Sequence, residues 1–393
     1  DWIDRLKLRY SIGKVGDDKV SGERWLYSSD YSYGGRAHLN ENSSGWSPYY
    51  FYRESRVGNP DIRWETAIKN NFGLEFGMLK NLFSLNFDYF TEDRTDILMS
   101  GSSRNIPPFF GATPPSANLG HVKSNGFEIE LGFNKRFNPN IQFWTNLSVT
   151  HNENTVIFRD DPPLQYDYLK AAGYQIGQQK SLVRTDFYTN WDEVYASVPT
   201  ETNDLAKLPG YYNLIDFNAD GIIKNSEDTP PIGYSEVPQN TITLSIGGTY
   251  KRISAMIQLR GVNNTTRNVP ANNFFTYTDV LFSHVRDYWS KNNPDATSFL
   301  PRWRTQANNI GDYYYYDASY FRVQNAEVSY SFSDMEWVKQ AGISNFRIFL
   351  NGNNLFFWSR LPDDRETTYS GGSATEGAYP AMRRINLGID LTF

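Results

Sequence analysis

The stretch Arg384-Ile385-Asn386-Leu387-Gly388-Ile389-Asp390-Leu391-Thr392-Phe393 decides the fold of this chain. Because side chains alternate across an extended strand, its apolar residues fall on one face and the remaining residues on the other. A strand of roughly 9–11 residues also crosses a bilayer when it is tilted in a barrel wall. The sequence therefore predicts a strand that faces lipid with one row of side chains, formed by Ile385, Leu387, Ile389, Leu391 and Phe393.

The same alternation recurs along the chain in about ten segments. Their apolar rows begin at Leu6, Phe72, Phe83, Phe127, Ile141, Ile242, Ile253, Ala326, Phe346 and Ile385. Charged and amide side chains take the opposite parity, among them Glu75, Asp88, Glu128, Glu130, Gln258 and Asp390. An Arg or Lys on the lipid face costs roughly 2–4 kcal/mol near the midplane, and carboxylates are also unfavourable there, so we expect these residues to face a polar interior.

Short and long connections alternate between these segments. The short ones cover 78–81, 137–140, 250–252 and 333–343, the last with a helical turn expected at 335–340. The long ones cover 14–63, 100–121, 152–239, 263–317 and 358–381. This sorting is typical of outer-membrane barrels, whose periplasmic turns are short and whose extracellular loops are long.

The fold class predicted is therefore all-β, an antiparallel transmembrane β-barrel with its long loops outside. The chain then ends at the periplasmic rim, where Tyr250, Phe332 and Phe346 would form an aromatic girdle. A β-sandwich with these aromatics in its core is the alternative, but a sandwich has no reason to sort its loops by length.

Composition narrows the function classes. Among 393 residues, 16% are aromatic, and Tyr and Trp suit membrane–water interfaces. No run approaches the roughly 18 apolar residues of a transmembrane helix, so membrane insertion would rest on strands. The chain has no Cys, which excludes disulfides and thiolate sites, and its formal charge of -6 argues against a nucleic-acid partner.

Several stretches resemble the SusC/RagA type of TonB-dependent transporter, the outer-membrane nutrient importers of Bacteroidetes. Residues 59–65 (NPDIRWE) resemble the family stretch NPxLxWE, and residues 120–128 (GHVKSNGFE) resemble its strand start GxVxNxGFE. The family loop DxNxDG is matched at 216–221. Its two late strands are echoed at 320–330 and 343–355, so the resemblance follows family order along nearly the whole chain.

The resemblance implies a barrel of about 22 strands with a plugged lumen, of which residues 1–393 would be the C-terminal part. It implies TonB-energised import of glycan or peptide oligomers, with a SusD-like surface lipoprotein as lid and TonB acting through an N-terminal plug. The plug and the first strands are expected outside this chain, because an open sheet edge is not tolerated in lipid. An outer-membrane receptor or adhesin that binds without import is the alternative.

One loop, residues 216–227, matches the calcium pattern Dx(D/N)x(D/N)Gx5E at every specified position. Calcium takes six to eight oxygen ligands, which side chains and one backbone carbonyl would supply here. The expected ligands are Asp216, Asn218, Asp220, the carbonyl of Ile222, and Glu227. An Asx-rich turn that is stable without metal fits the same residues.

Aromatic residues gather in the long loops, where they could contact a substrate or a partner. The candidates are Trp46, Tyr49, Trp289, Trp303, Tyr313, Tyr314, Tyr315 and Tyr316. Sugar rings stack on such faces, but packing against a partner protein or against another loop fits equally well.

Nothing in the sequence predicts an enzyme. The four histidines, at 38, 121, 151 and 284, show no metal-binding spacing, and the nucleophile turn GxSxG is missing. The paired carboxylates Asp160-Asp161 and Asp363-Asp364 are interpreted as solvated turns. We therefore expect transport or binding without bond chemistry, and a membrane-embedded hydrolase is disfavoured.

Overall fold

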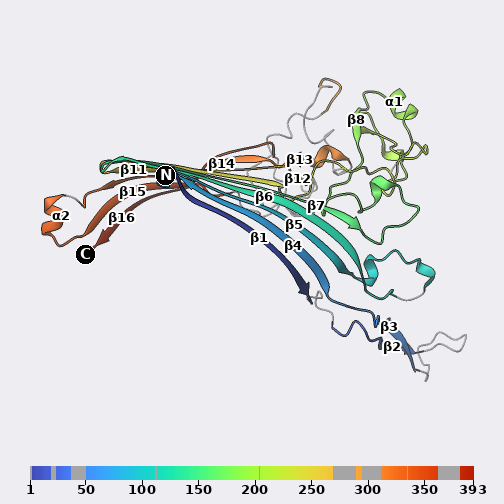
Figure 1. Cartoon of the computed structure of the whole chain (residues 1–393). Coiled ribbons are helices and arrows are strands. Elements are labelled where there is room, and N and C mark those ends of the chain that lie inside the picture. The colour runs from blue at the N-terminus through green and yellow to red at the C-terminus, as the bar shows by residue number, and fades with distance from the viewer. Residues whose placement is uncertain are drawn as a thin grey trace, which may run out of the picture.

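One antiparallel sheet of ten strands dominates the computed structural model (Figure 1). The structure describes residues 2–18, 24–36, 50–110, 113–202, 204–268, 289–293, 311–333, 335–361 and 381–393, with the backbone alone at 108, 206 and 314. The strands are β1 (Ile3–Asp17), β4 (Glu65–Met78), β5 (Phe83–Met99), β6 (Ala117–Asn138), β7 (Ile141–Phe158), β10 (Asn240–Tyr250), β11 (Ile253–Asn263), β14 (Tyr320–Ser331), β15 (Asn345–Ser359) and β16 (Arg384–Thr392). They pair in that order, which confirms the ten predicted strands.

The pairing register places the apolar rows of neighbouring strands on one face. Leu74 of β4 lies opposite Phe87 of β5, which lies opposite Ile129 of β6. At the other side of the sheet, Leu350 of β15 pairs with Leu387 of β16. Leu387 is 77% exposed, so no protein layer covers this part of the apolar face.

The opposite face carries charged and amide side chains, as the sequence predicted. Glu75 pairs across the sheet with Lys7 on one side and Asn86 on the other. The Arg9 Nη2 atom lies 3.0 Å from Asp88 Oδ2, and Lys7 Nζ lies 3.3 Å from Glu75 Oε1. The sheet thus has one apolar and one polar face.

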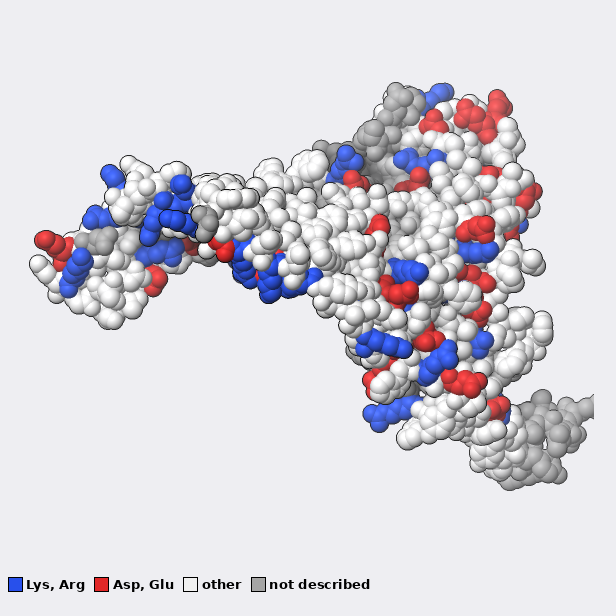
Figure 2. All heavy atoms as spheres, viewed as in Figure 1, with Lys and Arg blue, Asp and Glu red and all other residues white. Residues whose placement is uncertain are grey.

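Tight turns gather at one end of the sheet and long connections at the other (Figure 1). The turn end holds the short connections and helix α2 (Glu336–Gln340), which confirms the helical turn predicted there. The loop end holds β2 (Asp30–Arg36), β3 (Tyr50–Arg56), β8 (Arg184–Phe187), α1 (Trp191–Ala196), β9 (Tyr212–Leu214), β12 (Thr266–Asn268) and β13 (Tyr315–Asp317). Short 3-10 turns lie at Gly101–Ser103, Pro108–Phe110, Asp167–Leu169, Asp204–Ala206 and Asp312–Tyr314. Charged side chains of both signs are interspersed over the loop end, at the right of Figure 2.

Several strands run further into the loops than predicted. β7 continues to Phe158, whereas the loop was expected from residue 152, and β6 begins at Ala117 rather than after His121. In the β7 extension, polar residues (152–155) are followed by a block of apolar ones (156–158), so the sustained alternation that marks a strand in sequence is missing. Backbone pairing with the neighbouring strand holds them extended instead.

The aromatics expected to form a girdle do share the turn end. The rings of Phe332 and Phe346 stack with centroids 4.9 Å apart, and Tyr330 lies 4.6 Å from Phe332. Tyr250 pairs with Ile253, the residue opposite Tyr330. Which side of a membrane this end faces stays a prediction.

The sheet is open within the described residues. β1 pairs only with β4 and β16 only with β15, so these two strands are its edges. No helix in the described part of the chain is long and apolar enough to cross a membrane.

Candidate functional site

The connection between β7 and β10 forms a compact unit at the loop end, which we call the loop module (residues 159–239). Its small core packs Tyr188, Val194 and Tyr211, with Leu208 against them. Helix α1 begins at the cap Asn190, whose side chain accepts a hydrogen bond from the Glu193 N–H. The loop module therefore has a hydrophobic core of its own, next to which the 216–227 loop lies in sequence.

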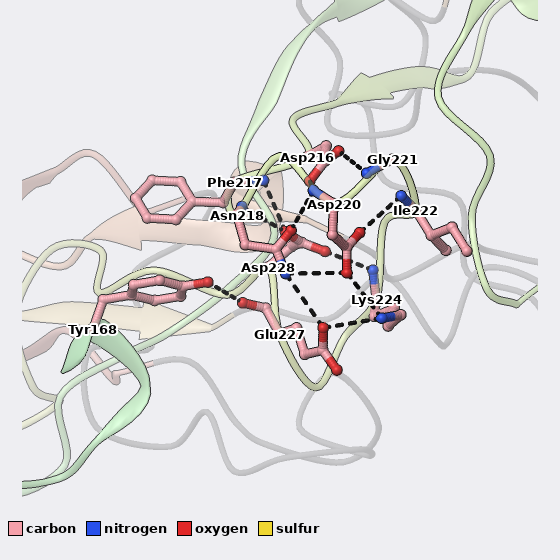
Figure 3. A network of polar contacts seen from close by, with 10 residues as sticks. All are labelled: Tyr168, Asp216, Phe217, Asn218, Asp220, Gly221, Ile222, Lys224, Glu227 and Asp228. Carbon is pink, nitrogen blue, oxygen red and sulfur yellow. Dashed lines mark hydrogen bonds and ion pairs between the residues drawn. The ribbon is translucent and has the colours of Figure 1, made fainter. Parts of the chain in front are cut away.

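The predicted calcium loop lies in this module (Figure 3). Its side chains accept hydrogen bonds from its own backbone. Asp216 Oδ2 accepts from the Gly221 N–H at 2.8 Å, and Asp220 Oδ1 accepts from the Ile222 N–H at 2.9 Å. Asn218 Oδ1 accepts from the Asp220 N–H at 2.9 Å. These bonds hold the first half of the loop in a tight turn.

Lys224 lies between the carboxylates that an ion would need. Its Nζ atom is 2.9 Å from Asp220 Oδ2 and 3.0 Å from Glu227 Oε2 (Figure 3). The Lys224 ammonium, with the Ile222 N–H, lowers the pKa of Asp220 to about 2, and the two carboxylates raise the pKa of Lys224. Among the described residues, no group of three or more His, Cys, Asp or Glu side chains is arranged to hold a metal.

Asp228, for which the sequence predicted no role, has a buried carboxylate that accepts hydrogen bonds from the backbone of the loop. Its side chain is fully buried, with Oδ1 accepting from the N–H groups of Phe217 at 2.8 Å and Asn218 at 3.1 Å. Oδ2 accepts from the Lys224 N–H at 2.7 Å. The only sequence signal was an acidic residue directly after the final position of the calcium pattern, which the pattern itself does not use.

The tyrosine tract reaches the loop module from β13 and the turn before it. The Arg184 guanidinium lies 4.4 Å from the ring centre of Tyr313 and 5.4 Å from that of Tyr212. These two rings lie 5.1 Å apart, and Arg184 Nε is 3.5 Å from Asp312 Oδ1. Tyr313 thus joins two loops that lie far apart in sequence.

The rest of the tract is also engaged with the protein. Tyr316 packs against the buried pair Ala318 and Leu361, and burial raises its pKa. The Tyr315 hydroxyl donates to the Lys180 carbonyl at 3.5 Å. The backbone of Tyr314 continues the 3-10 turn. In this geometry the tract packs between loops, which is one of the interpretations left open by the sequence.

Of the four remaining aromatic candidates, only Trp289 lies among the described residues. Trp289 lies so close to Gly210 that a Cβ atom there would be 2.3 Å from its ring. Its indole Nε1 atom is buried without a hydrogen-bond partner in the described structure. Trp46, Tyr49 and Trp303 lie outside the described residues.

One exposed aromatic pair was not predicted from the sequence as a candidate contact site. Trp191 and Tyr195 stack on helix α1 with centroids 5.9 Å apart and planes at 26°. Tyr195 is 80% exposed, so this pair stands open to solvent. The spacing of four residues after the Asn190 cap was a usable signal, because residues four apart share a helix face.

The polar face of the sheet carries a second cluster. A hollow of about 390 Å³ is lined by Arg5, Arg9, Glu75, Asn86, Asp88, Glu128 and Glu130. Glu130 accepts a hydrogen bond from Asn86 at 3.2 Å. For Glu128, no hydrogen bond or ion pair occurs within the part of the chain that is described.

Two of the histidines lie on strands, as expected of ordinary polar residues. His121 Nε2 is 2.6 Å from Asp93 Oδ1, and His151 Nδ1 is 2.6 Å from Asn240 Oδ1. The other two, His38 and His284, lie outside the described residues.

Comparison with known proteins gives a consistent family. The model of the family described as "TonB dependent receptor-like, beta-barrel" matches residues 22–355. A TonB-dependent receptor of Formosa agariphila is 23% identical over 420 residues, covering 100% of this chain and 40% of that protein. The TonB-dependent receptor SusC of Bacteroides thetaiotaomicron is 24% identical over 410 residues, covering 100% and 38%.

Solved structures share the fold. The RagAB peptide importer in its "open-open" state superposes with a TM-score of 0.69 at 17% identity, over 100% of this chain and 40% of that chain. A second structure, of the RagAB peptide transporter, gives 0.68 at 16% identity. The chain spans about 40% of the length of the curated relatives it matches.

Proposed function

The chain belongs to the TonB-dependent receptor family, in its β-barrel portion, and from this we propose that it forms part of the wall and loops of an outer-membrane nutrient importer. One observation carries the proposal. The pairing register brings the apolar rows onto one face and the charged rows onto the other. A wall between lipid and an aqueous interior needs these two faces.

We further propose that residues 1–393 are the C-terminal part of a longer barrel of about 22 strands. The exposed edges of β1 and β16 support this, because an unpaired strand edge is costly in lipid. The remaining strands and a plug would come from N-terminal residues of the same polypeptide. The carboxylates of Glu128 and Glu130 would then face that plug.

The proposed orientation puts the loop module outside the cell and the turn end in the periplasm. The stacked aromatics Phe332 and Phe346 suit the inner interface of the membrane. The apolar row of β16, which includes Leu387 and Ile389, would contact lipid directly. The long connections would then be available to extracellular ligands.

The proposed activity is TonB-energised import of a nutrient oligomer, with no bond made or broken. A SusD-like surface lipoprotein would close the extracellular mouth, and TonB would act through the plug. The relatives named TonB-dependent receptors support the coupling to TonB, and the likeness to the RagAB peptide transporter supports an oligomer as cargo. The proposed cargo is a glycan or a peptide oligomer.

The loop aromatics are proposed as contacts to cargo or lid. Trp191 and Tyr195 suit this role because their rings are stacked and exposed. Tyr313 and Tyr315 would act indirectly, by holding the loop module in place. Trp46, Tyr49 and Trp303 keep the role predicted from sequence.

The loop 216–227 is proposed as a Ca²⁺ site in competition with its own lysine. The motif supplies Asp216, Asn218, Asp220, Ile222 and Glu227 in calcium order. The Lys224 ammonium lies beside two of these carboxylates, those of Asp220 and Glu227, and neutralises them. Calcium would have to displace it.

The import proposal is tested with the complete polypeptide purified from its own outer membrane. We expect a surface lipoprotein to co-purify, and mass spectrometry of the complex to identify a trapped oligomer. Removal of the N-terminal segment that contacts TonB should abolish uptake of that oligomer while binding persists. If the complete polypeptide has neither plug nor TonB-contacting segment, the receptor or adhesin alternative replaces import.

A further inference from the structure

A cleft of about 900 Å³ lies at the loop end of the sheet, outside the features assigned above. Its floor includes Met99 of β5, Val122 of β6 and Val156 of β7. Val122 pairs with Val156, and six residues further along β6 lies Glu128. An even spacing along a strand keeps side chains on one face, so the cleft opens on the polar side of the sheet.

The loop module forms the opposite wall because its first part folds back onto β7. The Gly173 N–H donates to the Val156 carbonyl, and the Val156 N–H donates to the Tyr174 carbonyl, both at 2.8 Å. The Asn154 side chain accepts from the Ile176 N–H at 2.7 Å. The cleft is therefore built from the sheet and from a loop that the sheet holds in place.

The acidic groups of the cleft are already occupied by protein donors. Asp161 Oδ2 accepts from the N–H groups of Ala171 and Ala172, each at 3.0 Å. Asp160 Oδ2 accepts from the Asn105 N–H at 3.2 Å. Both aspartates were predicted as parts of a solvated turn, and that prediction is wrong because they are partly buried and bind backbone groups.

Of the three basic groups that line the cleft, two keep donors to spare. Arg104 is already engaged, because its Nη1 donates to the Pro115 carbonyl at 2.9 Å and its Nε forms an ion pair with Asp160 Oδ2 at 3.6 Å. Lys180 Nζ donates once, to the Lys170 carbonyl at 2.8 Å, although an ammonium has three donors. Arg159 is exposed, and no hydrogen bond or ion pair of its side chain occurs among the described residues.

Burial adds a second reason for the cleft to take a negative charge. It lowers the pKa of Lys180, because the charged ammonium loses water as it enters the protein. The ammonium also lies 5.1 Å from the ring centre of Tyr174. An anion beside it would replace part of the lost solvation and stabilise the charged ammonium.

The neutral residues beside these cations suit hydroxyl groups. Ser102 and Ser103 share hydrogen bonds with Ser100 at 3.1 and 2.9 Å. The side-chain amides of Asn105 and Gln165 also line the cleft. Hydroxyls and amides both donate and accept, as the hydroxyl groups of a sugar do.

We propose that this cleft binds an acidic oligosaccharide, whose carboxylate or sulfate groups meet Arg159 and Lys180. The inference rests on the proposed import function and names its cargo class. The spare donors are positive, the carboxylates are occupied, and the remaining lining suits a polyhydroxylated chain. Charge-assisted hydrogen bonds are about twice as strong as neutral ones, so the acidic groups would dominate affinity.

The test measures binding of tetragalacturonic acid and of a κ-carrageenan tetrasaccharide to the complete purified protein by calorimetry. Maltotetraose serves as the neutral comparison and tetraglutamate as the acidic peptide comparison. We expect at least one acidic sugar to bind about tenfold more tightly than maltotetraose, with affinity falling as salt rises. R159Q and K180Q should each weaken that binding by about tenfold.

Lys180→Gln removes the charge and retains amide N–H donors, and the side chain of Arg159 has no hydrogen bond or ion pair to lose among the described residues. Lys339→Gln is the matched control, since it removes one exposed positive charge from α2 at the turn end. Equal binding of neutral and acidic sugars, unchanged binding in both cleft variants, or preference for tetraglutamate overturns the inference. Uptake that depends on TonB without acidic-sugar binding would refute the cleft alone. Acidic-sugar binding without uptake would refute import alone.

Discussion

Asp228 is the single side chain on which the 216–227 loop depends most. Its carboxylate accepts three backbone hydrogen bonds and has no access to water. Asp228→Ala should leave the N–H groups of Phe217, Asn218 and Lys224 without their acceptor and destabilise the loop module locally by about 3 kcal/mol.

Hydrogen exchange of peptides across 214–230 checks this prediction, with faster exchange expected in the variant. Asp167→Ala is the control, because its side chain is 95% exposed. Equal exchange in the Asp228 variant and the unmodified protein would show that the buried carboxylate does not hold the loop.

Lys224 sets the calcium affinity of the same loop. Because its ammonium neutralises Asp220 and Glu227, Lys224→Gln should raise the affinity for Ca²⁺, by about tenfold for the loss of one competing charge. Calorimetric titration of calcium into chelator-treated protein measures this, with Asp220→Ala as the variant that should not bind. Absence of binding heat in both the unmodified protein and Lys224→Gln would end the calcium proposal.

The Asp220 carboxylate also gives the loop a pH dependence. Its pKa is lowered from 3.8 to about 2 in the folded protein, so its contribution to stability is complete above 3.8. The contribution is lost as the pH falls from 3.8 towards 2. Hydrogen exchange of the loop, corrected for the intrinsic rate, should be constant from pH 8 to 5 and accelerate below about pH 4. Asp220→Asn should remove this acid limb, and its persistence there would assign the effect to another group.

At the scale of the element, β16 offers the cleanest contrast between faces. Leu387 lies on the apolar face and is 77% exposed, whereas Asn386 lies on the polar face and donates to Asn351 at 2.9 Å. Leu387→Arg should cost about 2–4 kcal/mol in the membrane, and Asn386→Arg should cost little.

The measurement is the fraction of complete protein that reaches the outer membrane in a heat-modifiable, folded form. We expect a clear loss for the Leu387 variant only. An equal loss in both variants, or in neither, would contradict the assignment of faces on this strand.

The strands were predictable because their apolar rows alternate, as in Leu85 and Phe87 of β5 or Ile129 and Leu131 of β6. Their outer ends were not, since the polar residues of β7 beyond 152 are held extended by pairing alone. The short strands in the loops have three to seven residues and no sustained periodicity.

The candidate sites also combine features that were predictable from sequence with features that were not. The calcium pattern was visible because its residues are consecutive, but the position of Lys224 between two carboxylates depends on the fold of the loop. The contact of Arg184 with Tyr313 joins residues far apart in sequence. No local pattern encodes such a contact.

At the scale of the whole molecule, three observations agree with a segment of a β-barrel wall. They are the two-faced sheet, the separation of short turns from long loops, and the family match. The apolar face suits lipid, the polar face suits an aqueous interior, and the loop module stands at one end. The fold of RagAB agrees over the whole chain. The central claim is that these ten strands are a membrane wall with the loop module outside the cell.

Cysteine labelling tests this claim most directly, because the chain has no cysteine of its own. Tyr195→Cys places a thiol on α1 in the loop module, and Lys339→Cys places one on α2 at the turn end. Both are made in the complete protein, free of other cysteines, and intact cells are treated with a membrane-impermeant maleimide. The account predicts labelling of the Tyr195 variant in intact cells, and of the Lys339 variant only after the outer membrane is permeabilised. Labelling of the Lys339 variant in intact cells, or protection of the Tyr195 variant, would contradict it.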